Sequence, residues 1–246
     1  MAQGGKSLIE NPKVALIGCG YWGKNLCRNF RALGSLAQVV DPTDSGQAMA
    51  KKLAPQVPVS SVIEDALADP SVHAVALATP AETHAELAIR AMESGKDVFV
   101  EKPMALTLGD AERMRDVATR EGRILMVGHL LEYHPAVLKL RELVDGNALG
   151  GINYIYSNRL NFGKVRTEEN ALWSFAPHDV AVILRLFGES PIEVSATGGS
   201  YLTEGLADVT VSNLRFSNEC RAHIFVSWLH PFKEQRLVVV GDQKMM

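Results

Sequence analysis

The segment that most constrains the fold is a glycine-rich turn close to the start of the chain. The apolar run 13–17 leads into Gly18-Cys-Gly20-Tyr-Trp-Gly23, and a segment compatible with a helix follows. In a strand–turn–helix unit of this spacing, the first glycine makes the tight turn and the second lets the backbone approach a pyrophosphate. The third lets the helix pack on the strand. The flanking strand and helix signals therefore predict a dinucleotide site rather than an ordinary glycine turn.

A carboxylate follows the next predicted strand, residues 36–41. Asp41 ends this strand roughly 20 residues beyond the turn, where dinucleotide-binding folds place the acid that binds the adenosine ribose. Its oxygens would accept from the ribose 2′-OH, and its charge would repel the 2′-phosphate of NADP. We therefore expect NAD as the cofactor, with NADP less favoured. Tyr21 and Trp22 either line the cofactor turn or plug the core, and Trp22 is the better candidate to reach phosphate or ribose.

Strand and helix signals alternate along the first half of the chain. Short apolar strands are separated by helices of about ten to fifteen residues, which predicts an α/β fold with a doubly wound parallel sheet. We assign residues 1–129 to this NAD-binding Rossmann domain. In such sheets the carboxyl ends of the strands border the cofactor. Beyond the turn and Asp41, this rule selects Thr79, Glu101, Lys102 and His129.

The pattern changes from about residue 130. Helices are expected over 135–144 and 178–187, and strands over 152–157, 194–196, 209–216, 222–228 and 236–240. Because little helix separates the last strands, residues 130–246 are predicted to form an α+β domain with an open, largely antiparallel sheet. The chain stops just after a strand that reads as buried, so we expect further sequence beyond it.

Composition narrows the class of protein. The 246 residues are 47% hydrophobic and 22% charged, with a net charge of −3 and no basic run, which argues against nucleic acid or an anionic membrane as partner. No apolar stretch reaches the ~20 residues that span a bilayer, and the N-terminus lacks the apolar core of a signal peptide. The spacing of Cys19, Cys27 and Cys220 fits neither a zinc site nor a disulfide framework. We expect a cytoplasmic protein without a metal.

The segment Glu101-Lys102-Pro103 lies at the carboxyl end of a central predicted strand. Proline restricts the residue before it, so Lys102 is expected to hold a fixed pose at the cofactor cleft. One interpretation is a surface ion pair with Glu101. The interpretation we favour is general acid–base chemistry, because burial and a positively charged nicotinamide would both lower the pKa of a lysine.

A third candidate is His178, which follows Pro177 and is predicted in the first turn of the helix 178–187. Histidine titrates nearest neutrality and is the usual proton carrier, although a histidine at a helix start is also commonly structural. Asp179 is interpreted as an acid that complements the positive end of this helix.

Together these motifs resemble the Gfo/Idh/MocA oxidoreductase family, and the resemblance covers the whole chain. The shared features are the glycine turn, Thr79-Pro80 with His84, Glu101-Lys102-Pro103, Gly128-His129 and His178-Asp179. The segments 157–163 and 173–179 are also similar to the subgroup that oxidises carbon 3 of nucleotide-sugars, such as the UDP-N-acetylglucosaminuronate 3-dehydrogenases.

The resemblance implies a Rossmann domain that binds NAD or NADP, followed by a domain whose open sheet carries substrate and often joins subunits into a homodimer or homotetramer. It implies reversible oxidation of a sugar or polyol hydroxyl, with Lys102 and His178 as catalytic residues that contact the substrate. Thr79, Pro80 and His84 would border the cofactor, although His84 also suits a helix cap. Many relatives carry an Asp four residues before the catalytic His, where this chain has Ser174. This departure weakens a polyol dehydrogenase assignment.

Polar residues after a strand of the second domain are the candidates for substrate contact. Arg159, Asn161, Lys164 and Arg166 form either a solvated loop or a site for a diphosphate or carboxylate. The predicted function is hydride transfer between a nucleotide-sugar hydroxyl and NAD, and which of Lys102 and His178 is the base stays open. The alternatives are an NADP-dependent sugar ketoreductase, an inositol dehydrogenase and a non-enzymatic dinucleotide sensor.

Overall fold

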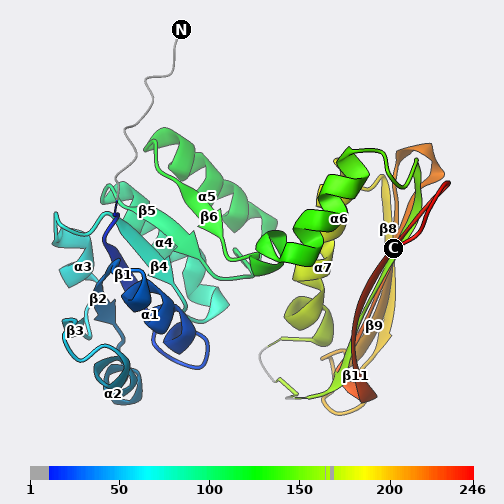
Figure 1. Ribbon diagram of the computed structural model, residues 1–246. Helices are drawn as coiled ribbons and strands as arrows, with labels where there is room; N and C mark the ends of the chain where they lie inside the picture. Colours follow the sequence, from blue (N-terminus) through cyan, green and yellow to red (C-terminus); the bar gives the residue numbers. More distant parts are fainter. Residues whose placement is uncertain (1–10, 164, 167–168) are drawn as a thin grey trace, which may run out of the picture. The chain divides into compact units, whose positions relative to one another are not determined.

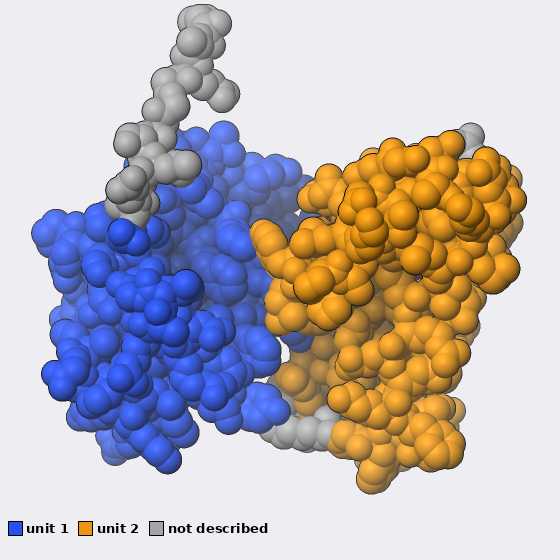
Figure 2. All heavy atoms as spheres, in the orientation of Figure 1, with its two compact units in different colours: residues 1–128 blue, residues 129–246 orange. Residues whose placement is uncertain are grey.

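The apolar run before the glycine turn forms strand β1 (Val14–Ile17), and all four of its residues are buried. The computed structural model describes residues 11–163, 165–166 and 169–246. These residues fall into two units, which divide between Gly128 and His129 (Figure 2). The boundary expected after His129 thus lies beside that residue, and His129 belongs to the second unit.

Unit 1 is a doubly wound parallel sheet, as predicted. Its six strands follow the order β3-β2-β1-β4-β5-β6, and every adjacent pair is parallel. The strands after β1 are β2 (Leu36–Val40), β3 (Val59–Ser60), β4 (Ala74–Leu77), β5 (Asp97–Val100) and β6 (Leu125–Val127). The helices are α1 (Gly23–Ala32), α2 (Asp44–Leu53), α3 (Glu64–Ala68), the 3₁₀ turn η1 (Ala81–Thr83), α4 (His84–Glu93) and α5 (Leu108–Arg120).

The side chains of β1 point alternately to the two faces of the sheet, and the core of unit 1 forms one layer on each face. Ala15 and Ile17 join a cluster with residues of α4 and α5, whereas Val14 and Leu16 join a cluster with residues of α1 and α2. Successive side chains of a strand point to opposite faces, so an apolar strand with no polar position requires a cover on both. The helices supply that cover (Figure 1), and the carboxyl ends of the strands stay at one edge of the sheet.

Unit 2 contains a five-stranded sheet in the order β11-β7-β10-β9-β8. Three adjacent pairs are antiparallel, and β7 with β10 is parallel, so the sheet is mixed but largely antiparallel, as predicted. Its strands are β7 (Ile152–Phe162), β8 (Glu193–Gly199), β9 (Val209–Arg215), β10 (Arg221–Ser227) and β11 (Leu229–Gly241). Its helices are η2 (Leu130–Tyr133), α6 (Pro135–Asp145), α7 (Ala171–Phe187) and η3 (Ser217–Glu219).

Helix α7 lies against one face of the unit 2 sheet (Figure 1), where Ile183 and Leu186 join the apolar core. The prediction that this helix begins at residue 178 is wrong. It begins at Ala171, because the side chain of Asn170 accepts a hydrogen bond from the backbone N–H of Trp173 and caps the end. Pro177 lies inside the helix, although a proline usually marks a helix start.

Among the described residues, no helix combines the length and the apolar character that crossing a membrane requires.

A buried carboxylate holds the connection between β8 and β9 in unit 2. Asp208 is fully buried, and its Oδ2 accepts the backbone N–H groups of Tyr201 and Leu202 at 2.6 and 2.9 Å. Its Oδ1 accepts the indole N–H of Trp228 at 2.5 Å. Desolvation pushes the pKa of Asp208 upward, but these hydrogen bonds outweigh it and hold the pKa below the ordinary value. Asp208 thus stays charged and ties the turn to the core.

We predict that Asp208→Asn lowers the free energy of unfolding by about 1–3 kcal/mol at pH 7, because the new amide N–H₂ faces donors that lose their acceptor. The wild-type carboxylate has a lowered pKa in the folded state, so its contribution is present at neutral pH and disappears as pH falls below the ordinary carboxyl pKa. Urea titrations of both proteins at pH 7 and pH 3.5 measure this. A difference that grows on acidification would contradict it.

Candidate active site

The glycine turn after β1 has the geometry that its spacing predicts. Gly18 adopts φ +90°, a left-handed conformation that favours glycine. A Cβ on Gly23 would lie 2.1 Å from the carbonyl oxygen of Gly18, so the helix approaches the strand too closely for any side chain. A Cβ on Gly20 would meet nothing within 4 Å. Gly20 therefore leaves open space above the backbone, where a phosphate could approach.

The N-terminus of α1 opens onto the same space. Its first turn carries no acidic residue, and no side chain caps it. Because backbone N–H groups and the helix dipole make such an end attractive to anions, α1 can hold a pyrophosphate beside Gly20.

Asp41 follows strand β2 and is hydrogen-bonded to the glycine turn. It is 5% exposed, and its Oδ2 accepts the backbone N–H of Cys19 at 2.7 Å. Its Oδ1 accepts the backbone N–H and the hydroxyl of Thr43 at 2.9 and 2.6 Å. A Cβ on Gly46 in α2 would collide with this carboxylate at about 2 Å. Asp41 thus fixes the turn. Its Oδ1 already accepts two hydrogen bonds, whereas Oδ2 accepts one and keeps a lone pair for a ribose hydroxyl.

An interaction that no sequence pattern signals joins the glycine turn to the end of β5. The indole N–H of Trp22 donates to Oε1 of Glu101 at 2.5 Å. In the sheet order, β4 lies between β1 and β5, so this bond crosses the carboxyl end of β4 near Thr79. The dinucleotide of a doubly wound sheet binds where the strand order reverses, which here is between β1 and β4. A dinucleotide bound at this point would therefore pass beside the indole.

Glu101 is enclosed at 9% exposure. Burial raises the pKa of its carboxyl group, and the hydrogen bonds from Trp22 and from the backbone N–H of Lys102 act in the opposite direction. A Cβ on Gly128 would lie 3.0 Å from Oε2, so the end of β6 also packs closely against this carboxylate. Glu101 thereby connects the ends of three strands.

Lys102 is half-buried at the end of β5, and its peptide bond to Pro103 is cis. The far side of this segment is held by His84, whose Nδ1 lies 2.8 Å from the carbonyl oxygen of Pro103 and whose Nε2 lies 3.0 Å from that of Thr79. His84 is 1% exposed. The Lys102 segment is thus fastened by Glu101 on one side and by His84 on the other. The contacts of the His84 ring are thus with the backbone carbonyl groups of Thr79 and Pro103.

Unit 2 brings three further candidates together. His178 lies in the third turn of α7, and its ring meets the ring of His129 edge-on, with centroids 6.2 Å apart. Ser174, one helical turn earlier, is 5% exposed. Residues four apart share one face of a helix. His178 and Ser174 therefore face the same side of α7, with His129 beside the histidine.

The position of Asp179 corrects its predicted role. Since α7 begins at Ala171, Asp179 lies in mid-helix and does not complement the helix dipole. Its carboxylate instead accepts Nε and Nη2 of Arg159 at 2.8 and 2.9 Å and the hydroxyl of Ser157 at 2.7 Å. Arg159, a predicted substrate residue, is therefore part of a buried ion pair that joins β7 to α7.

The remaining candidates for substrate contact are Asn161, Lys164 and Arg166, and neither Asn161 nor Arg166 joins the buried ion pair between β7 and α7. The Oδ1 of Asn161 is buried and accepts no hydrogen bond from the described residues. Arg166 forms an ion pair with Glu169 at 2.7 Å. Lys164 lies outside the described residues.

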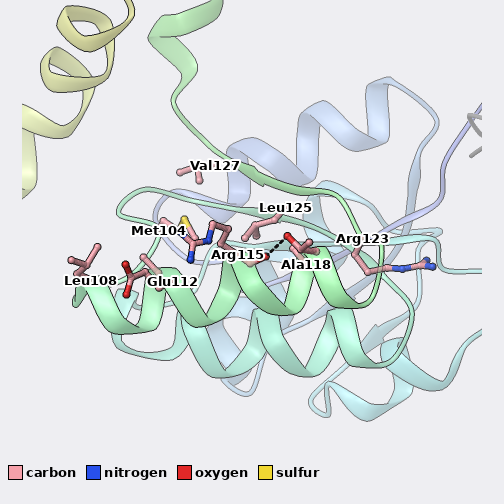
Figure 3. Close-up of a pocket in the computed structure, with 10 residues that line it drawn as sticks. Met104, Leu108, Glu112, Arg115, Ala118, Arg123, Leu125 and Val127 are labelled. Carbon is pink, nitrogen blue, oxygen red and sulfur yellow. Dashed lines mark hydrogen bonds between the residues drawn. The ribbon is translucent and has the colours of Figure 1, made fainter. Parts of the chain in front are cut away.

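The structure also contains a groove of about 560 Å³ between α5 and β6, which shares no residue with the predicted site. Figure 3 shows side chains of both elements around it, including Leu108, Arg115 and Leu125. Its lining is mainly aliphatic, and neither the glycine turn nor Asp41 borders it.

Cys19, inside the glycine turn, is buried, and desolvation together with neighbouring Cys27 raises the pKa of its thiol to about 12. The thiol therefore stays protonated at neutral pH.

The parallel sheet, the glycine turn and the acid at the end of β2 define a dinucleotide-binding protein of the Rossmann class. The chain belongs to the Gfo/Idh/MocA oxidoreductase family. Residues 12–129 match the family's oxidoreductase model with an NAD-binding Rossmann fold, and residues 137–246 match a Gfo/Idh/MocA C-terminal domain.

Similar proteins include enzymes of several named activities. The UDP-N-acetylglucosamine 3-dehydrogenase of Acidithiobacillus ferrooxidans is 28% identical over 87% of this chain and 66% of its own length. A 2,7-anhydro-N-acetylneuraminate hydratase of Mediterraneibacter gnavus is 29% identical over 83% of this chain and 58% of its own length. The crystal structure of GenD2 from gentamicin A biosynthesis, in complex with NAD, superposes with a TM-score of 0.87 at 26% identity, covering all of this chain and 74% of GenD2.

The chain thus spans about three-fifths to two-thirds of the length of these two curated relatives.

The two glycines of the turn provide a matched pair of variants. We predict that Gly23→Ala lowers the free energy of unfolding by about 3 kcal/mol, because its Cβ would overlap a backbone oxygen. Gly20→Ala should leave stability unchanged and weaken NAD binding by roughly tenfold or more, since its methyl group occupies the open space. Thermal unfolding and calorimetric NAD titration separate the two effects. Full NAD affinity in Gly20→Ala would contradict this site for the pyrophosphate.

The hydrogen bond between Trp22 and Glu101 predicts that the loss of stability in Trp22→Phe depends on pH. Phe at position 22 donates no hydrogen bond, so the buried carboxylate of Glu101 loses a partner and its raised pKa should rise further. A raised folded-state pKa of an acid costs stability as pH increases above the ordinary carboxyl pKa of about 4.5. The destabilisation by Trp22→Phe should therefore be larger at pH 8 than at pH 5. Thermal unfolding at both values measures it.

The control is the same substitution in a Glu101→Gln background, which carries no ionisable group at this position. There the effect of Trp22→Phe should be the same at both pH values. A pH dependence that persists without the carboxylate would assign it to another group.

Proposed function

We propose that the protein is an NAD-dependent oxidoreductase that transfers a hydride between the carbon of a sugar hydroxyl and nicotinamide. The observation that carries the proposal is the fastening of Lys102 beside the cofactor turn. Glu101 bonds both the turn, through Trp22, and the backbone of Lys102. An ionisable amine is thereby held at the end of β5, where the nicotinamide half of a dinucleotide would lie.

The described residues fit the cofactor. Gly20 leaves the space for the pyrophosphate, the N-terminus of α1 attracts it, and Oδ2 of Asp41 offers a lone pair to the adenosine ribose. The charge of Asp41 disfavours a 2′-phosphate, which supports NAD over NADP. When bound, the nicotinamide ring accepts or returns the hydride.

Acid–base chemistry is assigned to Lys102 and His178. As the hydride leaves the sugar carbon, one of these side chains takes the hydroxyl proton and the other donates a hydrogen bond to the oxygen that develops charge. The products are a ketone, NADH and a proton on the base. Ser174, in place of a carboxylate, cannot take part as a base, so proton transfer falls to these two groups.

For the substrate we propose a nucleotide-sugar, oxidised at carbon 3. Support comes from the name of the Acidithiobacillus relative, a UDP-N-acetylglucosamine 3-dehydrogenase. Arg159 and Asn161 are candidate contacts for the diphosphate or a carboxylate, with Ser174 near the sugar. The Nη1 of Arg159 is not used in its bonds to Asp179.

We further propose that the chain forms a homodimer or homotetramer through the unit 2 sheet. The face opposite α7 carries Tyr154, Tyr156 and Phe225, and Tyr154 is 41% exposed. Aromatic side chains are common at the centres of subunit interfaces. Light scattering after size exclusion measures the mass and tests this proposal.

We predict that Lys102→Met lowers turnover by roughly 10²–10⁴-fold, as expected for a lost acid or base. The dissociation constant for NAD should stay within a few-fold of the wild-type value. Lys51→Met, on the exposed side of α2, serves as the control and should retain activity. NADH absorbance measures turnover, and calorimetry measures NAD binding. Full turnover in Lys102→Met would remove this residue from the mechanism.

The substrate is sought with NAD and a panel of UDP-sugars, dTDP-sugars and inositol. Reduction of NAD by a UDP-N-acetylhexosamine or its uronate, and not by inositol, is the expected outcome. An NAD-binding protein that reduces NAD with none of the panel would favour a dinucleotide-sensing regulator.

A further inference from the structure

We propose that Asp179, held by Arg159 and Ser157, is a positioning residue that fixes the orientation of His178. This inference rests on the catalytic role proposed for His178. It concerns residues of unit 2 alone, and it gives the buried ion pair between β7 and α7 a task in the reaction.

The first step is the weakness of α7 just before His178. Pro177 lies inside the helix and has no backbone N–H, so the carbonyl group of Trp173 cannot receive the usual hydrogen bond from it. The proline ring also crowds the preceding turn. The turn that carries His178 is thus less firmly held by helical hydrogen bonds than the rest of α7.

The second step is the strength of the attachment directly after that point. Asp179 is 4% exposed and accepts three hydrogen bonds from β7, two from the guanidinium of Arg159 and one from the hydroxyl of Ser157. The two bonds from Arg159 engage both carboxylate oxygens, a paired geometry that fixes direction as well as distance. Ser157 is 1% exposed and Arg159 is 16% exposed, so water competes little for these groups.

The third step connects the ion pair to the histidine. His178 and Asp179 are consecutive, so their side chains leave α7 about 100° apart around its axis. Holding the Asp179 carboxylate against β7 therefore sets the rotation of this turn and with it the direction of the His178 ring. That direction is visible in the edge-on contact of His178 with His129, at 6.2 Å and 85°. A small rotation of the turn would change this contact.

The rest of the helix has its own anchors. Phe175 meets Trp228 edge-on at 6.4 Å, and Ile183 and Leu186 are buried in the core of unit 2. Loss of the ion pair should therefore leave α7 on the sheet and affect mainly the turn after Pro177. Arg159 acts through Asp179 in this scheme, and this role is separate from any contact of its Nη1 with substrate.

The test follows the imidazole signals of histidine-labelled protein by NMR, with the His178 signal assigned through its loss in His178→Gln. Asp179→Asn keeps the size of the side chain but removes its charge and one acceptor oxygen. We expect the His178 and His129 signals to shift in Asp179→Asn, while those of His223 and His230, on the sheet, stay in place. An unshifted His178 signal in folded Asp179→Asn would overturn the proposal.

The matched control is Glu193→Gln, which breaks the exposed pair of Arg215 with Glu193 on the same sheet, at 2.8 Å. It should leave the His178 signal unchanged, and an equal shift there would also overturn the proposal. If Asp179→Asn does not fold, Ser157→Ala removes one of the three bonds and retains the ion pair. A smaller shift in the same direction is then expected, and no shift counts against the role of Asp179.

Kinetics separate positioning from simple stability. With an active substrate, Asp179→Asn should lower kcat by roughly 10–100-fold with little change in KM, as expected for a misplaced catalytic group. Arg159→Lys should recover part of the kcat lost in Arg159→Met. A loss confined to KM would contradict positioning. Full turnover in His178→Gln would instead refute the proposed function, and the NMR result would stand independently of it.

Discussion

A carboxylate withdrawn from water keeps its charge only where hydrogen-bond donors replace the water, and both units use this constraint to join distant segments. In unit 1, Asp41 connects β2 to the glycine turn, and Glu101 connects β5 to the same turn through Trp22. In unit 2, Asp208 holds the β8–β9 connection, and Asp179 joins α7 to β7. The chemistry proposed for Lys102 and His178 depends on these bonds, because each follows or precedes one of the carboxylates directly along the chain.

The sequence predicts most of the fold because its periodicities are local. The strands of unit 1 and the largely antiparallel sheet of unit 2 follow from apolar runs separated by turn signals. The predicted start of α7 is wrong because a proline commonly marks a helix start, while the cap at Asn170 decides where this helix begins. Sequence motifs are sufficient to select Lys102 and His178 as candidate catalytic residues. The bonds that hold them do not, since Trp22 and Glu101 are far apart in sequence and meet only in the folded sheet.

The two matched family domains carry different parts of the proposed site. Unit 1 carries the features that recognise a dinucleotide, and they are shared widely among proteins of this fold. Unit 2 carries His129, Ser174 and His178 on or beside α7, where the proposed function places the contacts with substrate. The relatives differ in activity, since similar chains bear the names of a dehydrogenase and of a hydratase.

The strand order of unit 2 has a consequence for the course of folding. Strand β7 is the first strand of its sheet to be synthesised, yet its neighbours β10 and β11 are the last two, with Arg159 opposite Val226 and Gln235. Because contacts so distant in sequence close long loops, this sheet should assemble slowly compared with the local strand–helix units of unit 1. During translation, Ser157 and Arg159 therefore leave the ribosome well before the strands that flank them, and they acquire their final surroundings only when β11 has emerged.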